Sequence, residues 1–449
     1  MSGMLLEKLY PNTLVRKARA YSRKLWVRVV LMGLLSLVAL ALTQLIEHLV
    51  PKEIATSLTG SAADRLLQII ASAMLSVTIF SITVMVSVYR ASSTQWTPRI
   101  HRLIIQDRTT QNTLAVFIGA YVYSLVAIIM RELGIYVDER ALVLFAMTVI
   151  VLAVIVGYLI RWVLHLQTFG SLIDVTRQIE NTTRNSFLER LEDPCLGANP
   201  IKGDVPEDAE EIRAQESGYI QYIYPEALDR IAHDHGVELY LTRGVGSFVF
   251  LNEALVLAVK VAEPRDDEHD WESLENGVAA NIRLGDLRTY DQDPRFGLVA
   301  MGEVASKALS PGVNDPGTAI DVITRIGRIM SSYKDENDKG TEAKLKHLYV
   351  APLDPADLIE DGFGALARDG KSVLEVQQRL QAILSGLMRH PDDGLSQAAR
   401  EASEYHLRRA LQATEFAPDR ERLLAAARSD VRDAALKAND TPEGQSDAK

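Results

Sequence analysis

The stretch 66-LLQIIASAMLSVTIFSITVMVSVY-89 decides the fold of the first part of this 449-residue chain. A helix needs about 20 mainly apolar residues to cross roughly 30 Å of hydrocarbon, and this stretch meets that requirement. Three further apolar runs of similar length occur at Trp26–Ile46, Thr113–Met130 and Leu142–Leu164. The sequence therefore predicts a transmembrane domain of four helices over 1–165, followed by a soluble region.

Basic residues indicate how the helices are oriented. The first 28 residues hold seven Lys and Arg side chains and a single acid, Glu7. Four arginines follow the second span, whereas the loops after the first and third spans hold two basic residues each. Short loops rich in Lys and Arg stay on the cytoplasmic side. We therefore expect a multi-pass protein of the bacterial inner (plasma) membrane whose amino and carboxyl termini both lie in the cytoplasm.

The charge of the chain changes sign after the last span. Lys and Arg counted against Asp and Glu give +8 for residues 1–164 and −19 for 165–449, within a total of −11. The basic part suits anionic lipid, so the lipid bilayer is an expected partner, whereas the acidic part argues against nucleic-acid binding. The single cysteine, Cys195, excludes an intramolecular disulfide and agrees with a reducing compartment.

Hydroxyl side chains line one face of the second span. On a helix of about 3.6 residues per turn, Ser72, Ser76, Thr83 and Ser87 fall within about 60° of one another, with Phe80 at the edge. Small hydroxylated residues pack helices closely together and hydrogen-bond across the interface. Alternatively, copies of this helix line a water-filled pore in which Phe80 is a hydrophobic constriction. Both interpretations are open from the sequence.

The loop after the second span, 90-RASSTQWTPRIHRLIIQDRTTQN-112, is rich in arginine. Pro98 and the hydroxyls before it predict the start of a short amphipathic helix on the membrane surface. Alternatively, Arg99, Arg102 and Arg108 surround a cytoplasmic vestibule or bind lipid phosphate, because clustered guanidinium groups favour anions. Charged residues are almost absent from the spans, which argues against an ion-coupled transporter with buried carboxylates.

The soluble region divides by its patterns into four parts. Residues 166–215 predict a connecting helix and a linker rich in Pro and Gly, and 216–265 predict a small β-barrel or sandwich. The candidate strands are Gly218–Tyr222, Val237–Thr242, Phe248–Leu251 and Leu255–Val261. Residues 266–437 predict a helical subdomain with hairpins, and the tail 438–449 predicts disorder. The fold class is thus an α-helical membrane domain plus a cytosolic α+β domain.

A helical hairpin is predicted at 296-FGLVAMGEVASKALSPGVNDPGTAIDVITRIGRIM-330. Its turn lies at Ser310–Pro316, with Asp315 as N-cap of the second helix and Pro316 in the first helical position. A polar segment, 288-RTYDQDPR-295, precedes the hairpin. The segment and the turn together hold the candidate polar residues of the soluble region: Arg288, Asp291, Asp293, Arg295, Ser310, Asn314 and Asp315.

Several roles are open for these polar residues. They form a structural turn with an arginine–aspartate network, they bind a hard cation or a nucleotide, they carry out hydrolysis, or arginines of one subunit meet aspartates of the next. The chain has no P-loop, G-x-S-x-G, H-E-x-x-H or C-x-x-C motif. We therefore expect no enzyme activity, no cofactor and no metal centre.

Three stretches resemble the DUF2254 family of predicted bacterial membrane proteins. They are 76-SVTIFSITVMVSVYRASSTQWTPRIHRLIIQDRTTQNTLAVFIGAYVYSL-125, 217-SGYIQYIYPEAL-228 and 288-RTYDQDPRFGLVAMGEVASKALSPGVNDPGTA-319. The resemblance covers roughly residues 10 to 390, and 308-ALSPGVNDP-316 is its most specific part. Thr97 stands before Pro98 where the family pattern has serine. The resemblance implies an inner-membrane protein with amino-terminal spans and a soluble carboxyl-terminal domain.

These observations favour a homo-oligomeric, channel-like membrane protein. The second span would line the pathway, the soluble domain would form a vestibule or gate, and ions would pass. A chain with four spans is short for a lone transporter, and symmetric oligomers commonly build a central pathway. The alternative is a membrane-anchored scaffold or sensor whose acidic cytosolic domain binds a protein partner.

Overall fold

The computed structural model describes residues 60–105, 107–133, 141–261, 270–337 and 343–439, together with Val27 and Val30. The described residues fall into two compact units, one within 11–175 and one within 176–449. Apart from Val27 and Val30, the first predicted span, Trp26–Ile46, lies outside the described residues, as does the chain after residue 439.

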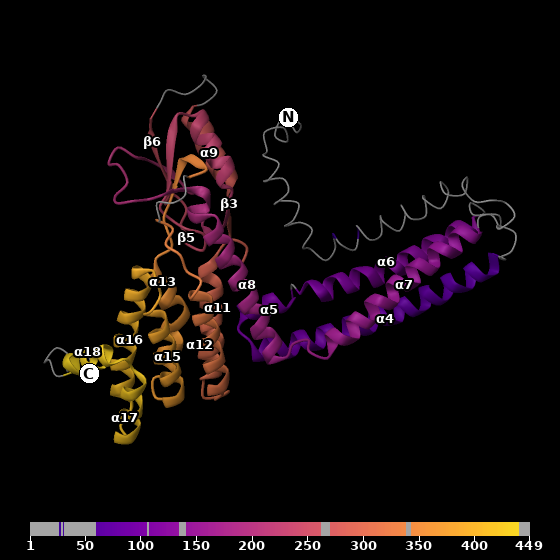
Figure 1. Cartoon of the computed structure of the whole chain (residues 1–449). Coiled ribbons are helices and arrows are strands. Elements are labelled where there is room, and N and C mark those ends of the chain that lie inside the picture. The colour runs from indigo at the N-terminus through magenta and orange to yellow at the C-terminus, as the bar shows by residue number, and fades with distance from the viewer. Residues whose placement is uncertain are drawn as a thin grey trace. The chain divides into compact units, whose positions relative to one another are not determined.

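The membrane unit contains the helices α4 (Gly60–Gln95), α5 (Pro98–Ile105), α6 (Arg108–Glu132) and α7 (Ala141–Leu166). Figure 1 shows α4, α6 and α7 as long helices that lie side by side. Among the described residues, three stretches are long and apolar enough to cross a membrane: Ser61–Ser93, Pro98–Glu132 and Leu144–Leu166. The first two contain the second and third predicted spans, and the last covers the fourth from Leu144 onward, so three of the four predicted spans lie in helices of sufficient length.

Helix α6 is the most buried of the three long helices. Its Phe117 is fully buried and packs with Trp162 of α7 and Met74 of α4. Tyr123 of α6 is also buried, and its hydroxyl oxygen lies 3.2 Å from that of Thr148 on α7. The described part of the unit is therefore a helical bundle organised around α6.

The second unit begins along α8 (Leu172–Glu192) and then forms two open sheets. The strands are β1 (Ala198–Pro200), β2 (Glu210–Arg213), β3 (Gly218–Ile223), β4 (Val237–Leu241), β5 (Phe248–Val249), β6 (Ala254–Lys260), β7 (Ile282–Gly285) and β8 (Leu345–Val350). One sheet has the order β1-β8-β4-β6-β2 and the other β5-β3-β7. Strand β8 is parallel to β1 and β4, and the remaining pairs are antiparallel.

The four strands predicted from the sequence are present, but the sheets that they join are not a closed barrel or a sandwich confined to 216–265. Strands β1, β2, β7 and β8 come from outside that range, and β8 separates β1 from β4. In the five-stranded sheet β1 and β2 are edge strands that each pair with one neighbour, so this sheet is open. Instead, one hydrophobic core joins both sheets to α9 (Pro225–Asp234) and α10 (Trp271–Asn281).

Helices form most of the rest of the second unit, and the strands β7 and β8 also lie within the range 266–437 that the sequence predicted as helical. They are α11 (Pro294–Ala308), α12 (Pro316–Met330), α13 (Pro355–Ile359), the π-helical turn η4 (Glu360–Gly364), α14 (Ala365–Asp369), α15 (Leu374–Leu387), α16 (Asp393–Ala413), α17 (Ala417–Ala426) and α18 (Ser429–Asn439). Figure 1 shows α11, α12, α15 and α16 as neighbouring helices. A Cβ atom on Gly302 of α11 would lie 2.9 Å from the carbonyl oxygen of Gly362, so this glycine permits the close approach of α11 and η4.

Candidate functional site

The hydroxyl stripe of the second span lies on α4, and its members are exposed in the single chain: Ser72, Ser76, Phe80, Thr83 and Ser87. Phe80 is 60% exposed. The Ser76 hydroxyl donates to the Ser72 carbonyl at 3.0 Å, and the Thr83 hydroxyl donates to the Ile79 carbonyl at 2.9 Å. Ser72 likewise donates to a carbonyl of the preceding turn. These hydroxyl protons are used within the helix, so the oxygens face outward mainly as acceptors.

The hydroxyl side chains of α6 and α7 are not exposed. The Ser and Thr side chains of α6 and α7 are buried apart from half-buried Thr109, and the buried ones are Thr110, Thr113, Ser124 and Thr148. The exposed face of α7 carries large apolar side chains, including Ile150, Val154 and Ile160. Of the described parts of α4, α6 and α7, only α4 thus exposes a row of hydroxyl side chains along its middle turns.

The arginine-rich loop contains the short amphipathic helix that the sequence predicted. Helix α5 begins at Pro98 and buries Ile100, Leu103 and Ile104. The predicted vestibule arginines surround it, with Arg99 and Arg108 exposed and Arg102 half-buried. The geometry agrees with a helix that packs its apolar face inward, and the proposed binding of phosphate stays a prediction.

A polar cluster beside α5 was not predicted. Asp107 caps α6, with its Oδ2 accepting from the backbone N–H and the hydroxyl of Thr110 at 2.7 and 2.8 Å. The same oxygen lies 3.1 Å from Nε2 of His165 on α7. A cap such as Asp107 has a local sequence signal, since it precedes a helix. Its histidine partner has none, because that contact depends on how α7 packs.

The polar segment 288-RTYDQDPR-295 serves as an internal brace of the second unit. Asp293 is buried, accepts from the Phe296 backbone N–H at 2.9 Å as N-cap of α11, and pairs with Arg288. Burial raises the pKa of the Asp293 carboxyl, and Arg288 opposes that shift. The Gln292 amide donates to and accepts from the backbone of Ile223, in the manner of a neighbouring strand.

The remaining predicted polar residues also have partners within the chain. Arg295 pairs with Asp361 at 2.6 Å and with Asp357 at 2.5 Å, which joins α11 to α13 and η4. Asp291 lies 3.7 Å from Arg283. Within the described residues, no group of three or more His, Cys, Asp and Glu side chains is placed to hold a metal ion.

The turn of the helical hairpin has the predicted cap. Asp315 accepts from the backbone N–H of Thr318 at 3.1 Å, and this hydrogen bond lowers the pKa of its carboxyl together with that from the Thr318 hydroxyl. Asn314 has a φ of 49°, a left-handed conformation that asparagine tolerates well. The Ser310 hydroxyl donates to the Lys307 carbonyl at 2.7 Å. These contacts account for the turn as a structural device, while a subunit contact stays a prediction.

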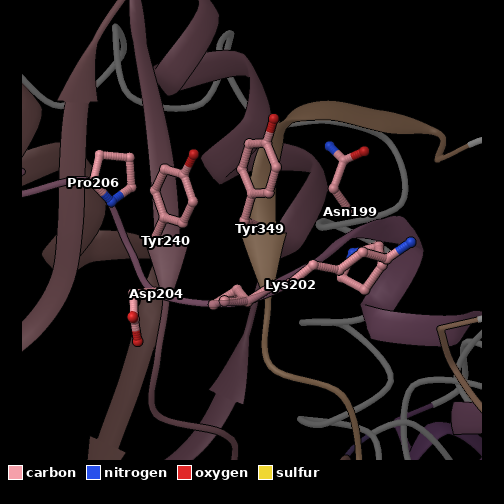
Figure 2. A pocket seen from close by; sticks show the side chains of 8 residues that line it. Asn199, Lys202, Asp204, Pro206, Tyr240 and Tyr349 are labelled. Carbon is pink, nitrogen blue, oxygen red and sulfur yellow. The ribbon is translucent and has the colours of Figure 1, made fainter.

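A hollow of about 360 Å³ lies over the five-stranded sheet and is lined by Asn199, Pro200, Ile201, Lys202, Asp204, Pro206, Tyr240 and Tyr349. Figure 2 shows the two tyrosines side by side on neighbouring strands, with Pro206 beside Tyr240 and Asn199 beside Tyr349. Their rings stack with centroids 4.4 Å apart and planes 8° from parallel. No local sequence pattern predicts this hollow, because it joins residues from three separate strands.

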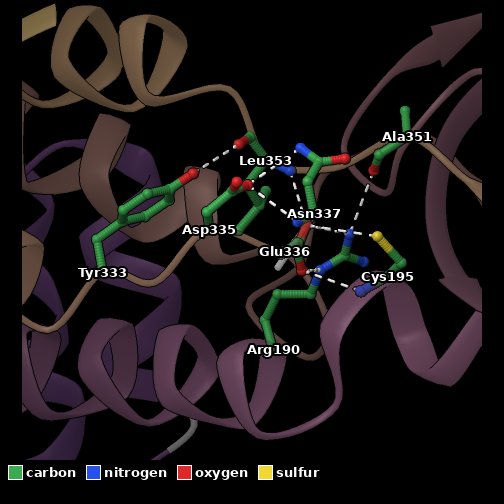
Figure 3. Close-up of polar contacts among 8 residues, drawn as sticks. All are labelled: Arg190, Cys195, Tyr333, Asp335, Glu336, Asn337, Ala351 and Leu353. Carbon is green, nitrogen blue, oxygen red and sulfur yellow. Dashed lines mark hydrogen bonds and ion pairs between the residues drawn. The ribbon is translucent and has the colours of Figure 1, made fainter. Parts of the chain in front are cut away.

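A second unpredicted feature is the buried carboxylate of Glu336, at which four segments of the chain meet (Figure 3). Its oxygens accept from both Nε and Nη2 of Arg190, from the Cys195 backbone N–H at 3.1 Å and from the Leu353 backbone N–H at 2.7 Å. The Glu336 side chain is fully buried and that of Arg190 is 10% exposed. Burial, and next the nearby Glu336, raise the pKa of the Cys195 thiol to about 12.

The comparison with known families decides the identity of the chain. The family model described as "Predicted membrane protein (DUF2254)" matches residues 22–385. The chain belongs to the DUF2254 family. An uncharacterised protein of Mycobacterium bovis and one of Mycobacterium tuberculosis are each 26% identical to it over 269 residues, which is 56% of this chain and 48% of the relative. The chain thus spans about half the length of the curated relatives it matches. No solved structure matches it.

The DUF2254 match contains the candidate sites described above. It extends from the first apolar run to within α15 and so includes the α4 stripe, the hollow and Glu336. Helices α16 to α18 follow the matched region. This DUF2254 protein is therefore a membrane protein with several apolar helices and a soluble α+β region that contains two open sheets.

Proposed function

We propose that this DUF2254 protein is a homo-oligomeric, channel-like protein of the bacterial inner membrane, in which α4 of each subunit lines the pathway. The observation that carries the proposal is the outward row of hydroxyls on α4, against the burial of nearly all Ser and Thr side chains on α6 and α7. Lipid chains cannot hydrogen-bond to hydroxyl oxygens. Water can donate hydrogen bonds to these oxygens, and a passing cation can be coordinated by them.

The stripe has a neighbouring apolar strip on the same exposed half of α4, formed by Leu75, Ile79, Ile82 and Val86. Two adjoining strips of different polarity suit a helix that faces an aqueous pathway with one strip and a neighbouring subunit with the other. Phe80 is the largest side chain beside the hydroxyls, and a ring of Phe80 side chains would close the pathway by excluding water. Both termini would lie in the cytoplasm, where the soluble unit would act as vestibule or gate without enzymatic activity.

The test is ion flux through the purified protein in liposomes. Phe80→Ala should raise the flux because it removes the constriction, and Thr83→Leu should lower it because it removes the hydroxyl and puts a larger apolar side chain in its place. Ile160→Ala on the apolar face of α7, where Ile160 is 58% exposed, is the matched control and should leave the flux unchanged. Mass measurement of the protein in native detergent should give a multiple of the 49.7 kDa chain.

Cysteine accessibility provides an independent readout. In a Cys195→Ala background, cysteines at positions 72, 76, 83 and 87 should react with a charged thiol reagent from water, and cysteines at 150 and 154 should not. If the thiol reagent reacted with neither set of cysteines and the folded protein carried no flux, the channel proposal would be refuted. A saturable protein partner of the soluble unit would then favour the scaffold or sensor.

A further inference from the structure

The hollow of Figure 2 is built over the exposed face of the five-stranded sheet. Strand pairing sets Tyr240 of β4 opposite Tyr349 of β8, and Tyr349 opposite Asn199 of β1, so the three side chains share one face. Strands β1 and β2 occupy opposite edges of this sheet. The segment 201–209 that connects them must therefore cross the sheet, and its residues supply the second wall of the hollow.

The phenol groups of the hollow offer acceptors and no donors. The Tyr240 hydroxyl donates to Oε2 of Glu238 at 3.0 Å, and the Tyr349 hydroxyl donates to Oε1 of the same carboxylate at 3.2 Å. Each phenol has a single proton, and Glu238 takes both. Burial raises the pKa of both phenols, and Glu238 raises them further, so the protons stay in place. What remains on each phenol oxygen is lone-pair density.

Asn199 is oriented in the same way. Its Nδ2 donates towards the carbonyl oxygens of Leu345, Lys346 and Leu348, at 3.1 to 3.2 Å. Three surrounding carbonyls accept hydrogen bonds only, so they fix the amide nitrogen on that side. The Oδ1 atom consequently faces away from β8, and Figure 2 shows it on the side of Asn199 that is turned away from Tyr349.

Three carboxylates lie at or near the hollow. Glu238 accepts from both phenols, Asp204 lines the hollow, and Asp208 is near enough to raise the pKa of Tyr240. Lys202 is the one cation of the lining. It is exposed and has no partner within the described chain, so its long side chain can move into water. The stacked rings add the negative potential of their faces.

We propose that this hollow binds a small organic cation through an ammonium or guanidinium group. Such a group brings three to five N–H donors to a site that offers acceptors, and the aromatic rings favour its charge. A phosphate or carboxylate would meet one cationic side chain, Lys202, beside the carboxylate of Asp204 and the lone pairs of the phenols. The size of the hollow is at the lower end of the range for ligand sites, which suits an alkyl amine or guanidine. This site is separate from the pathway proposed for α4.

The test is calorimetry on the full-length protein in detergent with agmatine, which carries both groups. Butylamine and 1-butanol compare a cation with its neutral isostere, and inorganic phosphate is the anionic control. We expect saturable heat from agmatine and butylamine, and none from butanol or phosphate. A short peptide with one arginine separates the two sources of the cation: tighter binding of agmatine indicates a free metabolite, and tighter binding of the peptide indicates a protein side chain.

Substitutions of the two charged residues that line the hollow test whether negative charge strengthens agmatine binding. Asp204→Asn should weaken agmatine binding and Lys202→Ala should tighten it, each by about two- to fivefold, because exposed charge pairs contribute about 0.2–1 kcal/mol. Tyr349→Phe keeps the ring and should weaken binding, whereas Tyr219→Phe on the other sheet should not. Thermal unfolding confirms that each variant is folded.

Three results would overturn the proposal. The first is phosphate binding that disappears in Lys202→Ala, which would make the hollow an anion site. The second is agmatine binding that neither Asp204→Asn nor Tyr349→Phe alters, which would place the cation elsewhere. The third is the absence of heat from both amines at millimolar concentration with the native protein folded.

Discussion

Replacement of Glu336 by glutamine should destabilise the second unit strongly, and more than the same change at the exposed Glu211. Glu336 accepts four N–H bonds, two of them from Arg190, and its side chain is fully buried. Glutamine has one acceptor oxygen, and its NH2 group would point at N–H donors in either orientation. The arginine would also lose the charge that compensates its own burial.

The size of this effect follows from the loss of the counter-charge. Removal of one partner of a buried ion pair costs about 3–5 kcal/mol, because the other charge stays buried and unpaired. A unit of this size loses about 2 °C in Tm per kcal/mol, so we expect a decrease of roughly 6–10 °C. The control is Glu211→Gln, which removes the partner of Arg213 from an exposed pair. That change should shift Tm by no more than about 2 °C, since exposed pairs contribute at most about 1 kcal/mol.

Thermal unfolding of the full-length protein measures the decrease, and Cys195 gives a local readout. This cysteine is buried, is the single one in the chain and contacts Glu336. Its reaction with a maleimide at pH 7 should be slow in the native chain and clearly faster in Glu336→Gln. A Tm equal to that of Glu211→Gln, with unchanged labelling of Cys195, would show that Glu336 does not hold these segments together.

Three further predictions concern packing and pH. Gly302→Ala should cost about 1–3 kcal/mol, because its Cβ would meet the Gly362 carbonyl oxygen, whereas Gly386→Ala, with open space around it, should gain about 0.5–1 kcal/mol in urea unfolding. Burial and then Arg409 lower the pKa of His406 to about 4. Its neutral form therefore contributes stability that is complete above about pH 6.5 and is lost as the pH falls to 4, so His406→Leu should lose about 2 kcal/mol less than the native chain between pH 7 and 5. The raised pKa of Cys195 acts at the other end: the stability from its buried thiol is complete below about pH 9 and is lost as the pH rises towards 12. Cys195→Ala should accordingly lose less stability than the native chain between pH 9 and 11, and equal losses in urea unfolding would contradict the assignment.

Local sequence signals predicted a large part of this fold. Apolar length located the helices α4, α6 and α7, and short β-rich runs between glycine turns located β3, β4, β5 and β6. The cap at Asp315 and the proline after it placed the start of α12 correctly. In each case the signal and the structure that it specifies lie within a few residues of one another.

Features that depend on distant partners were not predictable in this way. Strand β1 has three residues and pairs with β8, which follows more than a hundred residues later, so no short-range pattern links them. The hollow and Glu336 depend on the same long-range pairing. The acids of 288-RTYDQDPR-295 were recognisable as polar, but the arginine of each pair became identifiable only in the fold.

The position of β8 in the five-stranded sheet has a consequence for biosynthesis. Strand β4 pairs on one side with β6, which follows it closely in the chain. Its other edge pairs with β8, which is synthesised much later. Until the ribosome has released residues 345–350, β4 exposes an unpaired edge and β1 has no partner among the described strands. Such edges recruit other chains. Nascent chains that stall before residues 345–350 have left the ribosome should therefore aggregate or require a chaperone. Once these residues have emerged, β8 can pair with both β4 and β1.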